Sequence, residues 1–206
     1  MMDALDQSVG LVVEALNAER MLENSIVVFL SDNGGQPFGP HSNRGFNWPL
    51  RGFKGSVWEG ACRVPAFLWS PLLKRTRRVS QQMMHIVDWL PTLYHAAGGD
   101  SKRLKDQMDG KDMWRELSLN LPSPRVEFLY NIEPQDEIAA LRHHNYKLVL
   151  GVHYAGEYDD RYQTPGGSRS PYALDHLMAK SNVTRVLRYV KKGPLITSLC
   201  PSILRV

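Results

Sequence analysis

The fold of this chain is decided by the stretch Ile26-Val27-Val28-Phe29-Leu30-Ser31-Asp32-Asn33-Gly34-Gly35. Four apolar residues from Val27 to Leu30 are followed at once by polar residues and glycines, which predicts a buried strand that runs into a tight loop. In open α/β sheets, ligands bind just beyond the carboxyl ends of strands. Asp32 and Asn33 lie there, and their oxygen atoms suit a hard cation such as Ca²⁺ or Mg²⁺. The alternative is an Asp-Asn-Gly turn that binds no ligand.

The two glycines after Asn33 belong to the same prediction. Side chains of neighbouring strand residues point to opposite faces, so Asp32 and Asn33 reach one ion only if the strand ends there. Gly34 and Gly35 are expected to allow this, because glycine accepts backbone angles that are closed to other residues.

A second informative stretch is Trp48-Pro49-Leu50-Arg51-Gly52-Phe53-Lys54-Gly55-Ser56-Val57-Trp58-Glu59-Gly60. Lys54 has glycines at positions 52 and 55, and a lysine with small neighbours can present a compact positive charge to an anion. The alternative is that Lys54 and Arg51 are solvated loop charges, as most such residues are.

Together, residues 31–35 and 50–60 resemble the sulfatase family, and most of all its arylsulfatase B-like branch. Four further stretches match that family in order and spacing, although each would be weak alone: residues 5–10 (LDQSVG), 88–93 (DWLPTL), 108–112 (MDGKD) and 140–148 (ALRHHNYKL). Phosphatases of the alkaline phosphatase superfamily fit less well, because residues 50–60 look like the sulfatase version. Residues 186–206 no longer resemble the family.

The resemblance implies an α/β fold: a fragment of an alkaline phosphatase-like sandwich, with a mixed sheet and helices, followed by a small carboxyl-terminal antiparallel α+β subdomain. The predicted domains are residues 1–120, as the later part of a sulfatase catalytic domain, and residues 121–206. The implied activity is that of an arylsulfatase-type sulfuric ester hydrolase. In that family, Asp32 and Asn33 would ligate one Ca²⁺, and Lys54 would be a catalytic residue that binds a sulfate oxygen.

No stretch of this chain matches the motif that carries the nucleophile of such an enzyme. Sulfatases oxidise a cysteine, or in some members a serine, within a Cys-x-Pro-x-Arg type motif to formylglycine. Neither Cys62 nor Cys200 fits, and Asp159-Asp160 stands near the wrong end to be the family's early aspartate pair. We therefore expect formylglycine in a missing amino-terminal part and no activity of this chain alone. The alternative is a catalytically silent sulfatase-like binding protein or an incomplete gene product.

The remaining expectations concern partners and location. A 43% hydrophobic content is enough for a packed core, and a net charge of +4 without a nucleic-acid motif argues against nucleic-acid binding. No signal peptide or transmembrane segment is visible. The expected partners are a sulfated small molecule or glycan and the missing amino-terminal half. The resemblance implies a lysosomal or secreted parent protein, and Asn182 begins a glycosylation sequon that mildly supports that route.

Periodicity predicts the other elements. Helices are expected over residues 3–21 and 83–97, the second with a kink or a fresh start near Pro91 and an end at residues 98–99. Strands are expected over 64–70, 126–131, 139–142 and 146–151, the last two joined by a turn at residues 143–145. His85, Asp88 and His95 have spacings that would suit a metal on one helix face, but structural roles are favoured because Pro91 intervenes. His41 and the basic cluster 74–78 are expected on the surface.

Overall fold

The computed structural model describes residues 2–39, 41–104, 108–151, 156, 158–161 and 204–205. The chain divides into two compact units: Met1–Phe29 with Ala66–Val126, and Leu30–Pro65 with Glu127–Val206. Each is described by itself below. The predicted domains, 1–120 and 121–206, remain a prediction. Within the described residues, no helix combines the length and the apolar character needed to cross a bilayer.

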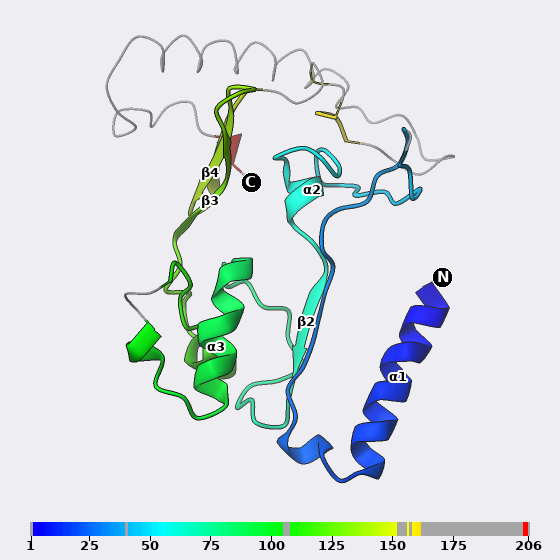
Figure 1. Ribbon diagram of the computed structural model, residues 1–206, viewed down its shortest axis with the longest axis vertical. Helices are drawn as coiled ribbons and strands as arrows, with labels where there is room; N and C mark the ends of the chain where they lie inside the picture. The colour runs from blue at the N-terminus through cyan, green and yellow to red at the C-terminus, as the bar shows by residue number, and fades with distance from the viewer. Residues whose placement is uncertain are drawn as a thin grey trace. The chain divides into compact units, whose positions relative to one another are not determined.

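The first unit begins with helix α1, Met2–Ala18, followed by the 3-10 turn η1, Leu22–Asn24 (Figure 1). Asp3 lies in the first turn, where a carboxylate interacts favourably with the helix dipole. The helix is shorter than the predicted 3–21, because Arg20 adopts a left-handed backbone with φ 57° and Met21 N donates back to Leu16 O at 2.8 Å. This closing turn is typical of helix C-termini.

Strand β1, Val27–Leu30, pairs with strand β2, Ala66–Trp69, in a two-stranded sheet. The strand bounds predicted for residues 27–30 are confirmed, and β2 lies inside the predicted 64–70. Phe29 of β1 stacks on Phe67 of β2, with ring centroids 5.5 Å apart. Such aromatic cross-strand pairs help to define which residues of two strands lie opposite each other.

Helix α3, Trp89–Ala96, follows the 3-10 turn η2, Ile86–Asp88. The predicted helix over 83–97 is wrong at its first residues, but the fresh start predicted near Pro91 is confirmed: the α-helix begins at Trp89, so Pro91 lies in the first turn, where its missing N–H costs nothing. The predicted end is confirmed, because Gly98 has φ 89° and Gly99 N donates to Tyr94 O at 2.9 Å. Turn η3, Ser101–Leu104, and helix α4, Trp114–Leu119, complete the unit.

The second unit combines the short helix α2, Glu59–Cys62, with an antiparallel sheet in the order β3-β4-β5-β6. Its strands are β3 Glu127–Glu133, β4 Ile138–His143, β5 Tyr146–Leu150 and β6 Leu204–Arg205. The predicted hairpin turn is confirmed: His143 pairs with Tyr146, and His144 takes the left-handed backbone (φ 50°) that a tight hairpin needs. The hydrophobic core consists of Val57, Trp58, Ile138, Ala140 and Val149, with Tyr130 packed against it.

Candidate functional site

The loop that leaves β1 presents two oxygen atoms. Asp32 Oδ1 accepts a hydrogen bond from Asn33 N at 2.8 Å, and Asn33 Nδ2 donates to Gly34 O at 2.9 Å. Asp32 is exposed and Asn33 half-buried. No hydrogen bond from the described part of the chain reaches Asp32 Oδ2 or Asn33 Oδ1. Because the other polar atoms of these side chains are held by neighbouring backbone, these two oxygens are the ones left for a ligand.

Gly34 and Gly35 are needed for a different reason from the one predicted. Neither has a positive φ; what they permit is close approach of two loops. A Cβ on Gly34 would lie 1.7 Å from Gly60 O, and one on Gly35 would lie 2.6 Å from the backbone of Gly45. Gly34 N also donates to Ala61 O at 2.8 Å. The prediction of special backbone angles is therefore wrong, and lack of a side chain is the property that matters.

Lys54 lies on the loop that Gly34 touches. Its backbone N donates to Gly35 O at 3.2 Å, so the two sequence motifs are joined by a direct hydrogen bond. Gly52 and Gly55 flank it with φ of 79° and 88°, and these left-handed angles turn the chain on either side of Lys54. The Lys54 residue itself is exposed. An exposed ammonium group on a tightly turned loop can present its charge to an anion.

Both ends of the Lys54 loop are held. Gly60 N donates to Arg51 O at 2.6 Å and closes the loop. The Arg51 guanidinium lies 4.0 Å from the centre of the Trp58 ring and donates to Asp159 O, while Trp58 Nε1 donates to Asp159 Oδ1 at 2.7 Å. Arg51 is thus packed and bonded, which rules out the solvated-charge alternative for this residue. Asp159, which sequence patterns left without a role, is an anchor of the loop.

A buried carboxylate follows Lys54 by five positions. Glu59 accepts hydrogen bonds from Lys147 Nζ at 2.9 Å, from Arg142 Nη1 at 3.3 Å and from the Tyr130 hydroxyl. The Lys147 ammonium also lies 3.4 Å from the centre of the Tyr130 ring. Burial by itself would raise the pKa of Glu59, but Lys147, Tyr130 and Arg142 outweigh it and hold that pKa below its usual value.

The neighbours of Glu59 respond to the same environment. Burial lowers the pKa of Lys147 against the opposing pull of Glu59, and burial together with the Glu59 hydrogen bond raises the pKa of Tyr130. Sequence reasoning missed this cluster. A signal was present in β5, where Lys147 alternates with Tyr146 and Leu148 and so shares the face of the core residue Val149.

The other candidate residues do not form a metal site. Asp88 is buried and accepts from Arg125 Nε at 2.7 Å, whereas His95 Nδ1 lies 2.6 Å from Asp112 Oδ2. Their structural roles are as expected. In the part of the chain that the structure describes, no three His, Cys, Asp or Glu side chains gather as metal ligands do. His41 is exposed, as are Lys74, Arg75 and Arg77 of the basic cluster, while Arg78 is half-buried and donates to Leu117 O. Cys200 and Asn182 lie outside the described residues.

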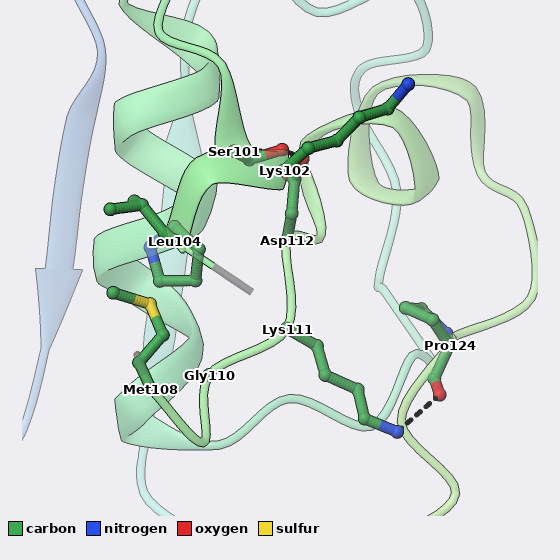
Figure 2. Close-up of a pocket in the computed structure, with 9 residues that line it drawn as sticks. Ser101, Lys102, Leu104, Met108, Gly110, Lys111, Asp112 and Pro124 are labelled. Carbon is green, nitrogen blue, oxygen red and sulfur yellow. Dashed lines mark hydrogen bonds between the residues drawn. The ribbon is translucent and has the colours of Figure 1, made fainter. Parts of the chain in front are cut away.

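A pocket of about 350 Å³ lies in the first unit, against α3 and residues 101–104 and 108–112 (Figure 2). Its lysines are not aimed at a common point. Lys111 Nζ donates to Pro124 O at 3.0 Å on the pocket wall. The Lys102 side chain extends in a different direction from that of Lys111 (Figure 2). The Asp112 carboxylate accepts a hydrogen bond from the Ser101 hydroxyl at 2.7 Å. The pocket contains none of the predicted site residues.

Comparisons with known proteins point to one family. The model of the family described as Sulfatase matches residues 1–99, a range that contains Asp32, Asn33 and Lys54. Arylsulfatase J of Mus musculus is 45% identical over 134 residues, which are 65% of this chain and 22% of that protein. Steryl-sulfatase of the same species is 30% identical over 74% of this chain and 25% of that protein. The chain spans about a quarter of the length of these curated relatives.

A solved structure agrees on the fold. The PsFucS1 sulfatase from Pseudoalteromonas sp. superposes with a TM-score of 0.60 at 23% identity, over 91% of this chain and 40% of that one. A similarity at this identity supports the fold alone. The predicted α/β, alkaline phosphatase-like class is confirmed, and the structure has helices, a two-stranded sheet and a four-stranded antiparallel sheet among its described residues.

Proposed function

Because residues 1–99 of this chain belong to the sulfatase family, we propose that it supplies the Ca²⁺-binding and sulfate-binding loops of an arylsulfatase-type sulfuric ester hydrolase. The observation that carries the proposal is the hydrogen bond from Lys54 N to Gly35 O, two residues beyond Asn33. This hydrogen bond joins the loop that carries Lys54 to the loop in which Asp32 and Asn33 supply two possible oxygen ligands for a cation. A cation site and an ammonium group side by side are what a sulfate monoester requires.

Asp32 Oδ2 and Asn33 Oδ1 fit a Ca²⁺ ion in type and in availability. Both are oxygen donors without a protein partner among the described residues, and Ca²⁺ takes six to eight such ligands. Two ligands are a part of that shell, so the others would come from a further segment or from the ester. Bound there, Ca²⁺ would supply Lewis-acid polarisation of a sulfate oxygen.

Lys54 has two roles in this proposal. Its ammonium group binds a sulfate oxygen in the ground state, and it stabilises negative charge that develops on the ester as the bond to sulfur breaks. The residue is suited to this because its backbone is held by Gly35 while its exposed side chain remains accessible to an ester. The substrate class is a sulfated small molecule or glycan.

The nucleophile is proposed to lie elsewhere. Cys62 ends α2 and has Pro65 three positions on, which does not match Cys-x-Pro-x-Arg. Formylglycine is therefore assigned to an amino-terminal segment that partners this chain. A lysosomal or secreted location and glycosylation at Asn182 belong to the same proposal. A catalytically silent binding protein is the alternative that the experiment separates.

The test is to express the chain together with an amino-terminal sulfatase segment and to assay a fluorogenic aryl sulfate with Ca²⁺ present. Lys54→Met should abolish turnover, and Lys74→Met should serve as the control, since Lys74 is also exposed but lies outside both motifs. Full turnover of Lys54→Met with Ca²⁺ bound would remove Lys54 from the mechanism. Binding of 4-nitrophenyl sulfate without any turnover would establish the silent protein.

A further inference from the structure

The carboxylate of Glu59 receives donors from three successive strands of the carboxyl-terminal sheet. Tyr130 comes from β3, Arg142 from β4 and Lys147 from β5. The Glu59 side chain is 10% exposed and that of Lys147 is 3% exposed. A charge so far removed from water is retained only where its partners compensate the lost hydration. The cluster therefore ties α2, at whose start Glu59 lies, firmly to the sheet.

The same residue ends the loop that carries Lys54. Gly60, the next residue, closes this loop by donating to Arg51 O, and the backbone of Gly60 is the group that Gly34 touches. A shift of Glu59 would thus move the end of the loop that carries Lys54. Gly60, which follows Glu59 in the chain, therefore connects the carboxyl-terminal sheet to the loop of the proposed sulfate site.

We propose that Glu59 is a positioning residue for Lys54, through which the Tyr130–Arg142–Lys147 cluster of the carboxyl-terminal sheet sets the affinity for a sulfate ester. The inference rests on the proposed function. Glu59 does not touch the ester; its carboxylate holds the loop so that the Lys54 ammonium meets the anion without a cost of ordering.

The carboxylate is required because of its neighbours, not because of its size. Glutamine has the same shape, but its amide NH₂ would face a donor, either Lys147 or Arg142. Two donors facing each other in a buried place repel, so the glutamine variant must shift the start of α2 or admit water. The pKa directions agree with an ionised Glu59, because its partners outweigh the effect of burial.

Binding of 4-nitrophenyl sulfate to the full chain with Ca²⁺ present tests the inference, followed through the backbone amide signals of Lys54 and Gly55. Glu59→Gln is expected to weaken binding by about tenfold or more, since small misplacements of a binding group are costly. Tyr130→Phe removes one of the three donors and should have a smaller effect in the same direction. Asp136→Asn, an exposed acid in the turn between β3 and β4, is the matched control and should leave the affinity unchanged.

A double-mutant comparison distinguishes positioning from general stabilisation. In a Lys54→Met background, Glu59→Gln should have no further effect on the affinity, because its influence passes through Lys54. Circular dichroism at low temperature identifies the variants that remain folded, and if Glu59→Gln unfolds, Tyr130→Phe replaces it in the comparison.

Two outcomes separate the inference from the function on which it rests. Wild-type affinity in folded Glu59→Gln and Tyr130→Phe, with affinity lost in Lys54→Met, would overturn the positioning role and leave the proposed function standing. Wild-type affinity in Lys54→Met would overturn both. An equal loss for Glu59→Gln with and without Lys54 would show that Glu59 acts on the fold and not on Lys54.

Discussion

The buried carboxylate of Asp88 and the guanidinium of Arg125, 37 residues apart in the chain, form a two-pronged ion pair in which Arg125 Nε lies 2.7 Å from Asp88 Oδ2. Asp88 also accepts from His85 N at 2.8 Å and from Lys111 N at 2.7 Å. One side chain thus caps the turn before α3 and binds two later segments. The sequence motif around Asp88 is structural within this unit.

Asp88→Asn is expected to lower the free energy of unfolding by about 3–5 kcal/mol, because it leaves the Arg125 charge buried without its counter-charge. Urea denaturation measures the change. Asp100→Asn is the control: Asp100 pairs with Arg103 at 3.6 Å on the surface, where such pairs contribute about 1 kcal/mol or less. Equal effects of the two substitutions would contradict the structural role of Asp88.

Gly34→Ala is expected to destabilise the chain by about 1–3 kcal/mol, because the new methyl group would overlap the backbone of Gly60 and force two loops apart. Gly10→Ala gives the opposite expectation. Gly10 lies in α1, and a methyl group added to it would meet no atom within 4 Å, so alanine should stabilise the helix by about 1 kcal/mol. Thermal unfolding of both variants checks the contrast in sign, and a stabilising Gly34→Ala would refute the close loop contact.

The stability that Glu59 provides should depend on pH in the acid range. Its pKa lies below the ordinary value of 4.5, so the folded state favours the ionised form. The contribution is therefore fully present above pH 4.5 and is lost as the pH falls through the folded pKa. The difference in unfolding free energy between the wild type and Glu59→Gln should be largest near neutral pH and shrink in acid. A difference that stays constant down to about pH 2 would contradict the ionised pair.

Ca²⁺ should stabilise the chain by mass action if Asp32 and Asn33 bind it. At a free concentration 100 times the Kd, the expected gain is about 2.7 kcal/mol. Asp32→Ala should abolish this gain, and EDTA should reverse it in the wild type. Asp6→Ala, an exposed acid on α1, is the control and should retain the gain. The same gain in Asp32→Ala would place the ion elsewhere.

Local sequence was a good guide to elements. The apolar run from Val27 to Leu30, followed by polar residues, predicted β1 to the residue, and the strand and turn signals predicted the hairpin of β4 and β5. Helix ends were less predictable. Arg20 ends α1 with a left-handed backbone, a conformation that its residue type does not favour. Likewise, the Asp88 side chain caps the turn at His85, so the α-helix starts later than the apolar pattern suggested.

The candidate site was predictable in its residues but not in its support. Asp32, Asn33 and Lys54 stand in short motifs, and their roles remain predictions. The groups that hold their loops were missed, because Glu59 meets Lys147 across 88 positions and Trp58 meets Asp159 across 101. No local pattern reports which distant strand supplies a donor.

The sequence alone predicted a strand followed by Asp32 and Asn33, a lysine flanked by glycines at position 54, and a resemblance to the sulfatase family. These features are encoded within short windows, where side-chain period and glycine placement act directly on the backbone. The tertiary structure determines which charged side chains are buried away from solvent. A carboxylate can be buried only where other segments supply hydrogen-bond donors and positive charge, and the partners of Glu59 come from three strands of the carboxyl-terminal sheet.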